Sequence, residues 1–393
     1  MYIIKNKQLI KFTGMLLLLV FSFLNSGANK PSQVSEQEVS ARIELLNKMT
    51  PINLVYNKDV QSFIDVYTIK QRDHLAKIIG LSELYFPLFE EHLDKMGLPL
   101  ELKYLAIVES ALQPKAKSTS GAMGLWQFLF QASRMMGLQV NSYIDERCDP
   151  IKSTEAAAKY LKYLYENFND WELALAAYNG GIATVNAAII KSHGKKNFWD
   201  IRKHFSAETR GYVPAFIAVN YVMNHYDSYG IVPIKPIFNY DDIQMVELDK
   251  SVTFRQLSEL LTISVEELRF LNPSYIMDYI PVVVGTVQFF IPKSKVELFY
   301  KNLEHLKVES GPKVAKLPPI GDTEGRIKSL HIVAKGEFFH KIAMDYSCRV
   351  EDIQKWNNLK TRDLLAGQKL IIWKRIEEYP WFFVCETELS DLY

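Results

Sequence analysis

The apolar residues of positions 76–230 recur with helical spacing almost throughout this stretch. In 153–168 and 171–190, alanine, leucine and aromatic residues stand three or four positions apart, which is the period of one face of an α-helix. The sequence "NGG" at 179–181 predicts a break between two helices. Strand patterns are scarce here, so we expect 76–230 to form an all-α domain.

Two further helical features lie at the edges of this pattern. Ser153 and Thr154 fit the N-cap of a helix, because their side-chain oxygens can accept hydrogen bonds from the free amides of a first turn. Residues 29–75 are polar and mixed in character, and we interpret them as a helical lead-in to the domain.

Proline-rich stretches interrupt the pattern twice. "YGIVPIKPIFNY" at 229–240 places prolines among β-branched residues, and residues 308–325 are rich in glycine and proline. Proline restricts its own backbone and disfavours the helical conformation of the residue before it. These stretches predict extended linkers over 231–245 and 297–328.

Two short blocks that follow the helical domain resemble each other. Residues 254–273 align without gaps to residues 339–358 at a constant offset of 85 positions. A β-rich stretch flanks each block on both sides, which predicts a strand–helix–helix–strand unit that occurs twice. We expect these units over 246–296 and 329–374, followed by a tail over 375–393. The matched pairs are Phe254 with Phe339, Leu257 with Ile342, Val265 with Val350, Leu268 with Ile353, and Asn272 with Asn357.

The N-terminus has the pattern of a secretory signal. Lys5, Lys7 and Lys11 precede an apolar run at 12–24, and small residues follow it. Such a basic, apolar and small-residue order is typical of a cleaved signal peptide, and the run is short for a membrane span. We predict a signal peptide over 1–28, with an uncleaved membrane anchor as the alternative.

Composition and charge narrow the class of ligand. The chain has 393 residues, 48% of them hydrophobic and 12% aromatic, with a net charge of +1. A globular protein without a basic excess is not expected to bind nucleic acid as its main partner. Cys148, Cys348 and Cys385 are widely separated, so they predict no metal site and no complete set of disulfides. No cofactor is predicted either.

One acidic residue stands on an apolar helix face within "LAIVESALQP". At about 100° per residue, the apolar positions of this stretch fall within an arc of about 120° that also contains Glu109. Burial raises the pKa of a carboxylic acid, which keeps the acid protonated near neutral pH and able to donate a proton. Glu109 is therefore a candidate general acid. The apolar positions are Leu102, Leu105, Ala106 and Leu112.

The surroundings of Glu109 help to weigh this hypothesis. The alternative is a structural glutamate at a helix end, paired with Lys115 or Lys117. Residues 117–128, however, form a polar stretch with glycines that permit close approach of a ligand to the backbone. Gln127 in this stretch can hydrogen-bond a sugar hydroxyl or amide. These features favour a glycan-binding cleft.

Four motifs in a fixed order resemble the catalytic domain of the soluble lytic transglycosylases, in the form found in membrane-bound lytic murein transglycosylases of the D type. The repeated unit at 331–373 resembles a LysM module, which binds glycans that contain N-acetylglucosamine. Both resemblances imply peptidoglycan glycan strands as the partner, and the sequence identifies no protein partner. The four motifs are "ES" at 109–110, "SGAMGLWQF" at 120–128, "AYNGG" at 177–181 and "ETRGYVPAF" at 208–216.

The resemblance implies a mainly α protein, with a lysozyme-like helical domain followed by two small α+β LysM-like modules. It also implies cleavage of the β-1,4 bond between N-acetylmuramic acid and N-acetylglucosamine, with formation of 1,6-anhydromuramic acid ends. Glu109 would first protonate the leaving oxygen and then take the proton of the C6 hydroxyl. The enzyme would be exported and would work in the periplasm or cell envelope.

The remaining site residues follow from the motifs. By resemblance, Ser118 and Gln127 contact substrate, Tyr178 lies near the acid, Asn179 orients the glycan, and Tyr212 stands beside Glu109. We find no second acid in the matched motifs near Glu109, whereas a standard glycosidase uses two carboxylates. Glu208 stands in the fourth motif, but pairing with Arg210 or capping of a helix explains it as easily.

Three questions stay open at this point. The chain could instead be a muramidase that hydrolyses the same bond with water. It could also be a non-catalytic protein that binds peptidoglycan. The first LysM-like unit departs most from the LysM pattern, and a structural role fits it as well as glycan binding does.

Overall fold

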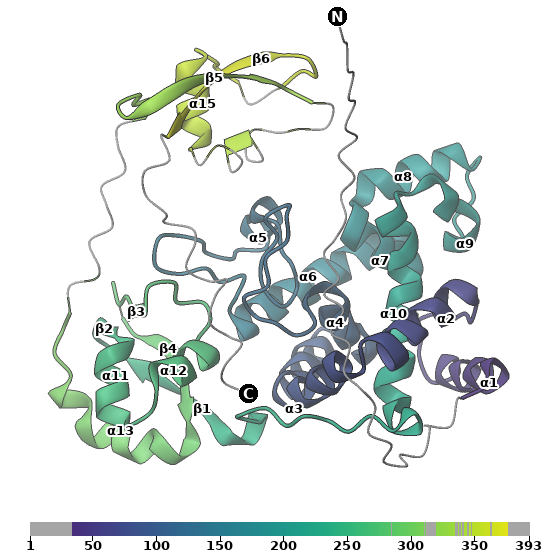
Figure 1. Ribbon diagram of the computed structural model, residues 1–393, viewed down its shortest axis with the longest axis horizontal. Helices are drawn as coiled ribbons and strands as arrows, with labels where there is room; N and C mark the ends of the chain where they lie inside the picture. Colours follow the sequence, from purple (N-terminus) through teal and green to yellow (C-terminus); the bar gives the residue numbers. More distant parts are fainter. Residues whose placement is uncertain are drawn as a thin grey trace, which may run out of the picture.

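The computed structural model describes residues 34–283, 285–309, 311 and 320–375, apart from 335–336, 338, 340–341, 344–345, 347 and 362–363. A large helical part comes first, a small α+β module follows it, and a second small module carries strands β5 and β6 (Figure 1). The predicted signal peptide, the end of the tail and Cys385 lie outside the described residues. Cys148 and Cys348 are free thiols.

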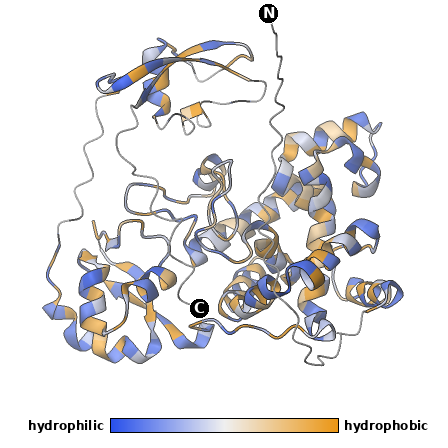
Figure 2. Ribbon diagram, in the orientation of Figure 1, coloured by the Kyte–Doolittle hydropathy of each residue, from blue (hydrophilic) through white to orange (hydrophobic). Residues whose placement is uncertain are grey.

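The helical part confirms the mainly α fold predicted from the periodicity. Apolar and hydrophilic residues alternate along its helices (Figure 2), as expected of helices that each bury one face. A π-helical turn follows α2, and a 3₁₀ turn precedes α4. The helices are α1 (Glu36–Asn47), α2 (Lys58–Asp65), α3 (Arg72–Lys95), α4 (Leu105–Ser110), α5 (Phe130–Met135), α6 (Pro150–Phe168), α7 (Trp171–Gly180), α8 (Ile182–Lys191), α9 (Phe198–Ile201) and α10 (Ala207–His225).

One hydrophobic core unites the helical part. Its buried residues run from Val39 in α1 to Ile231 after α10. Ile43 and Ile64 of the segment interpreted as a lead-in are buried in the same core. Helix α10 is buried on nearly all sides over Tyr212–Val222, so it forms the centre around which the other helices pack.

The start of α6 corrects one prediction. The N-cap is Asp149, whose carboxylate accepts hydrogen bonds from the amides of Ile151 and Lys152, at 3.0 Å each. Pro150 occupies the first helical position, where its fixed φ suits the helix and its missing N–H costs nothing. Ser153 and Thr154 therefore do not cap this helix but lie inside it.

The predicted break after "AYNGG" is confirmed. Helix α7 ends at Gly180 and α8 begins at Ile182. Gly181 between them has a φ of 84°, a conformation that glycine adopts without a steric penalty. Within the described part of the chain, no single helix is long and apolar enough to cross a membrane; α7 and α8 meet that test only together, across a bend of 119°.

The first module has its own hydrophobic core. Strands β1 and β4 pair antiparallel, with Val246 opposite Phe289. The short strands β2 and β3 pair in a second ladder. Helix α13 lies where a linker was expected, and its Phe299 is fully buried in the core of the module. The elements are β1 (Ile243–Leu248), β2 (Val252–Thr253), α11 (Phe254–Leu261), α12 (Val265–Leu271), β3 (Tyr279–Ile280), β4 (Val287–Pro292) and α13 (Val296–Asn302).

The second module repeats the central features of the first. It contains β5 (Arg326–Ile332), α15 (Val350–Trp356) and β6 (Lys369–Arg375), with β5 and β6 antiparallel. The matched asparagines make equivalent bonds. Asn272 bonds the backbone N–H and C=O of Phe290 on β4 at 2.7 and 2.8 Å. Asn357 bonds the same groups of Ile371 on β6 at 2.6 and 2.7 Å.

The chain between the helical part and the first module runs against α3. The amide of Ile234 donates a hydrogen bond of 3.0 Å to the carbonyl of Ala76 in α3. A Cβ atom at Gly80 would stand only 1.7 Å from the Ile234 carbonyl oxygen. The glycine therefore permits a direct contact between this segment and the helix.

Candidate active site

Glu109 opens onto a cavity of about 400 Å³ at the end of α4. The helix ends one residue later, because Ala111 and Leu112 both have left-handed backbone, with φ of 51° and 62°. The helical wheel therefore does not extend to Leu112, although this side chain is fully buried. The cavity is lined by Tyr67, Gln71, His74, Ile78, Ile107, Val108, Glu109, Ser110, Ala111, Ala116, Lys117, Ser118 and Gln127.

Burial controls the protonation of Glu109. Removal from water is the largest effect and raises the pKa of this carboxyl from 4.5 to about 7. A hydrogen bond from Tyr212 opposes the rise, and the negative charge of Glu208 adds to it. Glu109 is thus an acid that is partly protonated at neutral pH, as a general acid–base catalyst requires.

Tyr212 is the hydrogen-bond partner of Glu109. It lies in the second turn of α10, is buried, and donates its hydroxyl hydrogen to Oε1 of Glu109. Burial, followed by the charge of Glu109, raises the pKa of the phenol well above its ordinary value, so the phenol stays neutral and remains a donor. The carboxyl group of Glu109 is therefore partnered by a tyrosine.

The loop of residues 117–128 supplies another wall of the cavity. Ser118 accepts a hydrogen bond of 3.0 Å from the amide of Ala122, which closes a turn at the start of the loop. Gln127 has a φ of 48° and donates from Nε2 to the carbonyls of Ala116 and Gly124, at 3.0 and 2.9 Å. Both predicted contact residues thus line the same cavity as Glu109.

Tyr178 and Asn179 stand at the end of α7, outside the residues that line this cavity. The hydroxyl of Tyr178 donates a hydrogen bond of 2.8 Å to the carbonyl of Trp126. The pKa of this phenol is raised well above its ordinary value by burial and then by the charge of Glu109. Asn179 accepts a hydrogen bond of 2.8 Å from Thr209 and donates one of 3.1 Å to Glu208. Asn179 thereby joins α7 to the first turn of α10.

Two residues of the motifs support the site from inside the core. The hydroxyl of Ser110 donates to the carbonyls of Ala106 and Leu125. The indole N–H of Trp126 donates to Thr154 at 2.9 Å, and its ring is almost fully buried. Trp126 is thus a core residue rather than a platform for a sugar ring.

Three polar residues that line the cavity were not predicted from the sequence. Tyr67, Gln71 and His74 line the cavity together, although the backbone of Gln71, with φ of −124° and ψ of 37°, interrupts the helical path between the other two. Tyr67 belongs to the π-helical turn Val66–Lys70 and His74 to the beginning of α3, and Gln71 is the residue between these two elements. Their position at the cavity depends on how these elements pack, so no local pattern in the sequence identifies them.

The site contains no candidate metal centre. Across the part of the chain that the structure describes, no group of three or more histidine, cysteine, aspartate or glutamate side chains could hold a metal ion.

Comparison with protein families defines the class of these domains. Residues 87–201 match the transglycosylase SLT domain, residues 242–308 the LysM-like domain of the lytic transglycosylase MltD, and residues 331–373 the LysM domain. The chain thus combines an SLT domain with two LysM-type domains, which confirms the resemblance and the fold class inferred from its motifs.

The chain is also similar to particular curated proteins and to a solved structure. The chain is 27% identical over 308 residues to the membrane-bound lytic murein transglycosylase D of Escherichia coli strain K12. This alignment covers 77% of this chain and 66% of that protein. The chain thus spans just under two thirds of that relative. It is also 32% identical over 181 residues to the membrane-bound lytic murein transglycosylase F of Pseudoalteromonas translucida, which covers 39% of this chain and 37% of that protein. The crystal structure of the 70-kDa soluble lytic transglycosylase of Escherichia coli matches half of the chain and 31% of that protein, at 25% identity and a TM-score of 0.34.

Proposed function

We propose that the protein is a peptidoglycan lytic transglycosylase that cleaves the β-1,4 bond between N-acetylmuramic acid and N-acetylglucosamine. The supporting observation is that Glu109, with a pKa of about 7, is the sole carboxylic acid among the residues that line the cavity. A reaction in which the substrate supplies its own nucleophile needs a single acid–base group.

The reaction follows from two successive proton transfers, one from Glu109 and one back to it. Protonated Glu109 gives its proton to the glycosidic oxygen as the bond from that oxygen to C1 of the muramoyl residue breaks. The resulting carboxylate then takes the proton of the muramoyl C6 hydroxyl, and the C6 oxygen bonds to C1. Glu109 ends in its starting state, no water is consumed, and the product carries a 1,6-anhydro ring.

The neighbours of Glu109 divide into two groups. Ser118 and Gln127 line the cavity and are assigned to contacts with the glycan. Tyr212 stabilises the carboxylate that forms after the first proton transfer, because it donates a hydrogen bond to it. Tyr178 and Asn179 hold the surrounding loop and helix in place through Trp126 and α10.

The second module is assigned to anchoring on the same polymer. It matches the LysM domain over 331–373 and has its own core around Ile342 and Ile353. Such an anchor raises the local concentration of glycan at the catalytic domain. The cell envelope, where peptidoglycan lies, is the proposed location of the protein.

Product analysis tests the proposed reaction. Purified full-length protein is incubated with peptidoglycan sacculi, and the released muropeptides are identified by mass spectrometry. Anhydro ends support the proposal, reducing ends indicate a muramidase, and no release indicates a binding protein. Glu109→Gln should lose activity by a factor of about 10² to 10⁴, whereas Glu101→Gln, outside the cavity lining, should retain it.

A sedimentation assay tests the anchor. Full-length protein and a variant that ends at residue 330 are mixed with sacculi, and the bound fraction of each is measured after centrifugation. The shorter variant should bind more weakly. Equal binding of the two proteins would remove the second module from the proposal.

A further inference from the structure

Arg147 connects two ends of the loop that faces Glu109. Its side chain is buried, and its Nη1 atom donates to the carbonyl of Gly121 at 3.1 Å and to the carbonyl of Phe128 at 3.4 Å. Phe128 directly follows Gln127, and Gly121 closes the turn that begins at Ser118. The guanidinium therefore holds the loop next to both proposed glycan contacts.

Asp145 fixes the orientation of that guanidinium. Its carboxylate accepts hydrogen bonds from Nε and Nη2 of Arg147, at 2.9 and 2.7 Å. This two-point contact uses one edge of the planar group and leaves Nη1 directed at the loop. Because both charges are buried, each requires the other to remain where it is.

The backbone beside Arg147 also touches the loop. A Cβ atom at Gly124 would lie 1.8 Å from the carbonyl oxygen of Arg147. The loop therefore packs directly on the segment that carries the arginine. The hydrogen bonds of the Arg147 side chain and this backbone contact therefore both hold the stretch from Gly121 to Phe128.

The segment 143–147, which carries Arg147, is also hydrogen-bonded to the first module. The amide of Asp145 donates to the carbonyl of Ser274 at 2.8 Å, and the amide of Ile276 donates to the carbonyl of Tyr143 at 2.9 Å. Ile144 and Tyr275 thus form an antiparallel bridge between the two domains.

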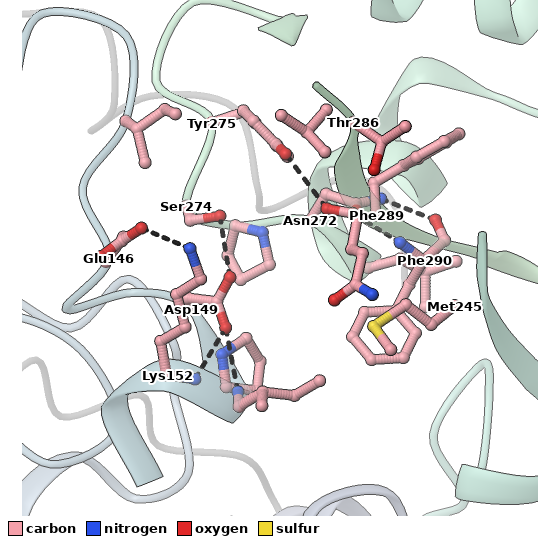
Figure 3. Close-up of a pocket in the computed structure, with 17 residues that line it drawn as sticks. Glu146, Asp149, Lys152, Met245, Asn272, Ser274, Tyr275, Thr286, Phe289 and Phe290 are labelled. Carbon is pink, nitrogen blue, oxygen red and sulfur yellow. Dashed lines mark hydrogen bonds and ion pairs between the residues drawn. The ribbon is translucent and has the colours of Figure 1, made fainter. Parts of the chain in front are cut away.

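A cavity of about 290 Å³, lined by both polar and apolar residues, lies beside this bridge. Figure 3 shows Asp149 and Lys152 of the helical part on one side and Ser274 and Tyr275 of the module on the other. The hydroxyl of Ser274 points toward the Asp149 carboxylate at 3.5 Å. The module is thus joined to the helical part by backbone bonds and by polar side chains.

We propose that Arg147 is a positioning residue for the substrate loop, and that the first LysM-like module braces it through the Ile144–Tyr275 bridge. This inference rests on the proposed function, because it concerns the loop that holds Ser118 and Gln127. It assigns the first module a mechanical role in the catalytic unit and so chooses between the two roles that the sequence left open.

Substitution of Arg147 by lysine should have a specific effect on the kinetics. A lysine at position 147 keeps the charge but cannot bond Asp145 at two points and the loop at a third. The loop would loosen while Glu109 and Tyr212 stay in place. Arg147→Lys should therefore raise KM for glycan strands about tenfold, which corresponds to the loss of one charge-assisted hydrogen bond. It should leave kcat and the pH profile of kcat unchanged.

The matched control is Arg134→Lys, since Arg134 is exposed on the neighbouring helix α5. Hydrogen exchange in full-length protein gives a second readout, in the peptide that covers 117–128. Exchange should quicken at the amides of Met123 and Phe128, which are bonded across the loop, in Arg147→Lys alone. A fall in kcat at constant KM, or unchanged exchange, would overturn the assignment of Arg147.

The brace is tested from the side of the module. Ile276→Pro removes the amide that bonds Tyr143, whereas Ile276→Ala keeps this amide and removes only an exposed side chain. The proline variant should speed exchange in 117–128 and the alanine variant should not. Equal exchange in both would exclude the brace. These exchange rates need no activity, so they decide the brace even if sacculi digestion shows that the proposed function is wrong.

Discussion

The hydroxyl of Tyr212 donates a hydrogen bond to the carboxylate of Glu109, across 103 positions of the sequence. It joins the buried central helix α10 to the last turn of α4. Burial and the charge of Glu208 raise the pKa of Glu109, and this bond lowers it. The resulting pKa of about 7 is the balance of these effects.

Removal of the Tyr212 hydroxyl should shift the pH profile of the enzyme upward. The first step needs protonated Glu109, so kcat/KM should fall as pH rises through about 7. Tyr212→Phe removes the effect that lowers the pKa, so the fall should occur at higher pH. Turnover of sacculi measured between pH 5 and pH 9 checks this, with Tyr163→Phe on the surface as the control. A shift to lower pH would contradict the balance described.

Glu172 should make the folded state less stable at alkaline pH. Burial raises the pKa of this carboxyl to about 7, while hydrogen bonds from Trp199 and Asn53 oppose the rise. Because the pKa of Glu172 is raised in the folded state, the stability that this group contributes is fully present below about pH 4.5. This contribution is lost as pH rises through about 7.

Comparison with Glu172→Gln isolates this effect. The stability of the natural protein relative to the variant should decrease by up to about 3 kcal/mol between pH 4.5 and pH 8. Urea unfolding at several pH values measures the difference, and Glu109 contributes equally to both proteins. A constant difference across this range would show that Glu172 titrates normally in the folded protein.

A methyl group at Gly124 should be poorly tolerated. The Cβ atom of Gly124→Ala would meet the carbonyl oxygen of Arg147, and the residue has a φ of +87°. Gly137 has a similar φ of +85° but nothing within 4 Å of a Cβ atom, so it is a control for backbone strain alone. Gly137→Ala should cost about 1 kcal/mol of unfolding free energy, and Gly124→Ala about 3 kcal/mol. Equal costs, measured by urea unfolding, would show that the loop can move away from Arg147.

The paired asparagines should act only within their own modules. Asn272→Ala leaves the backbone N–H and C=O of Phe290 without their partner, and Asn357→Ala does the same to Ile371. Each change should cost about 2 kcal/mol of local stability. Hydrogen exchange should quicken in β4 for the first variant and in β6 for the second. Faster exchange in both strands for either variant would contradict the independence of the two cores.

Periodicity and motif order were sufficient to predict the helical fold, the repeat and the position of Glu109 beside Tyr212. The repeat was readable because Asn272 and Asn357 keep both their position and their bonding partners. The chain reversal after Ser110 was not readable, because Ala111 and Leu112 give no sign of left-handed backbone. The cap at Asp149 was missed because two hydroxyl residues further on resembled a cap, although Pro150 was a signal for it.

Contacts between distant segments were the least predictable part. Tyr67 and His74 reach the cavity because the π-helical turn and the start of α3 pack against each other, a contact that local patterns do not encode. The bonds of Asn179 to Glu208 and Thr209 likewise depend on how α7 meets α10. A motif shows which residues share a site, but it does not show which of them contact substrate and which hold the others.

The abrupt end of α4 has an electrostatic consequence for Glu109. The last carbonyls of a helix carry partial negative charge, because the peptide dipoles align along the helix axis. Glu109 is the penultimate residue of α4, and Ala111 and Leu112 turn the chain away directly after it. The helix end therefore repels a negative carboxylate and favours the protonated acid. The backbone at this helix end and the burial of Glu109 thus both favour the protonated acid that donates in the first step.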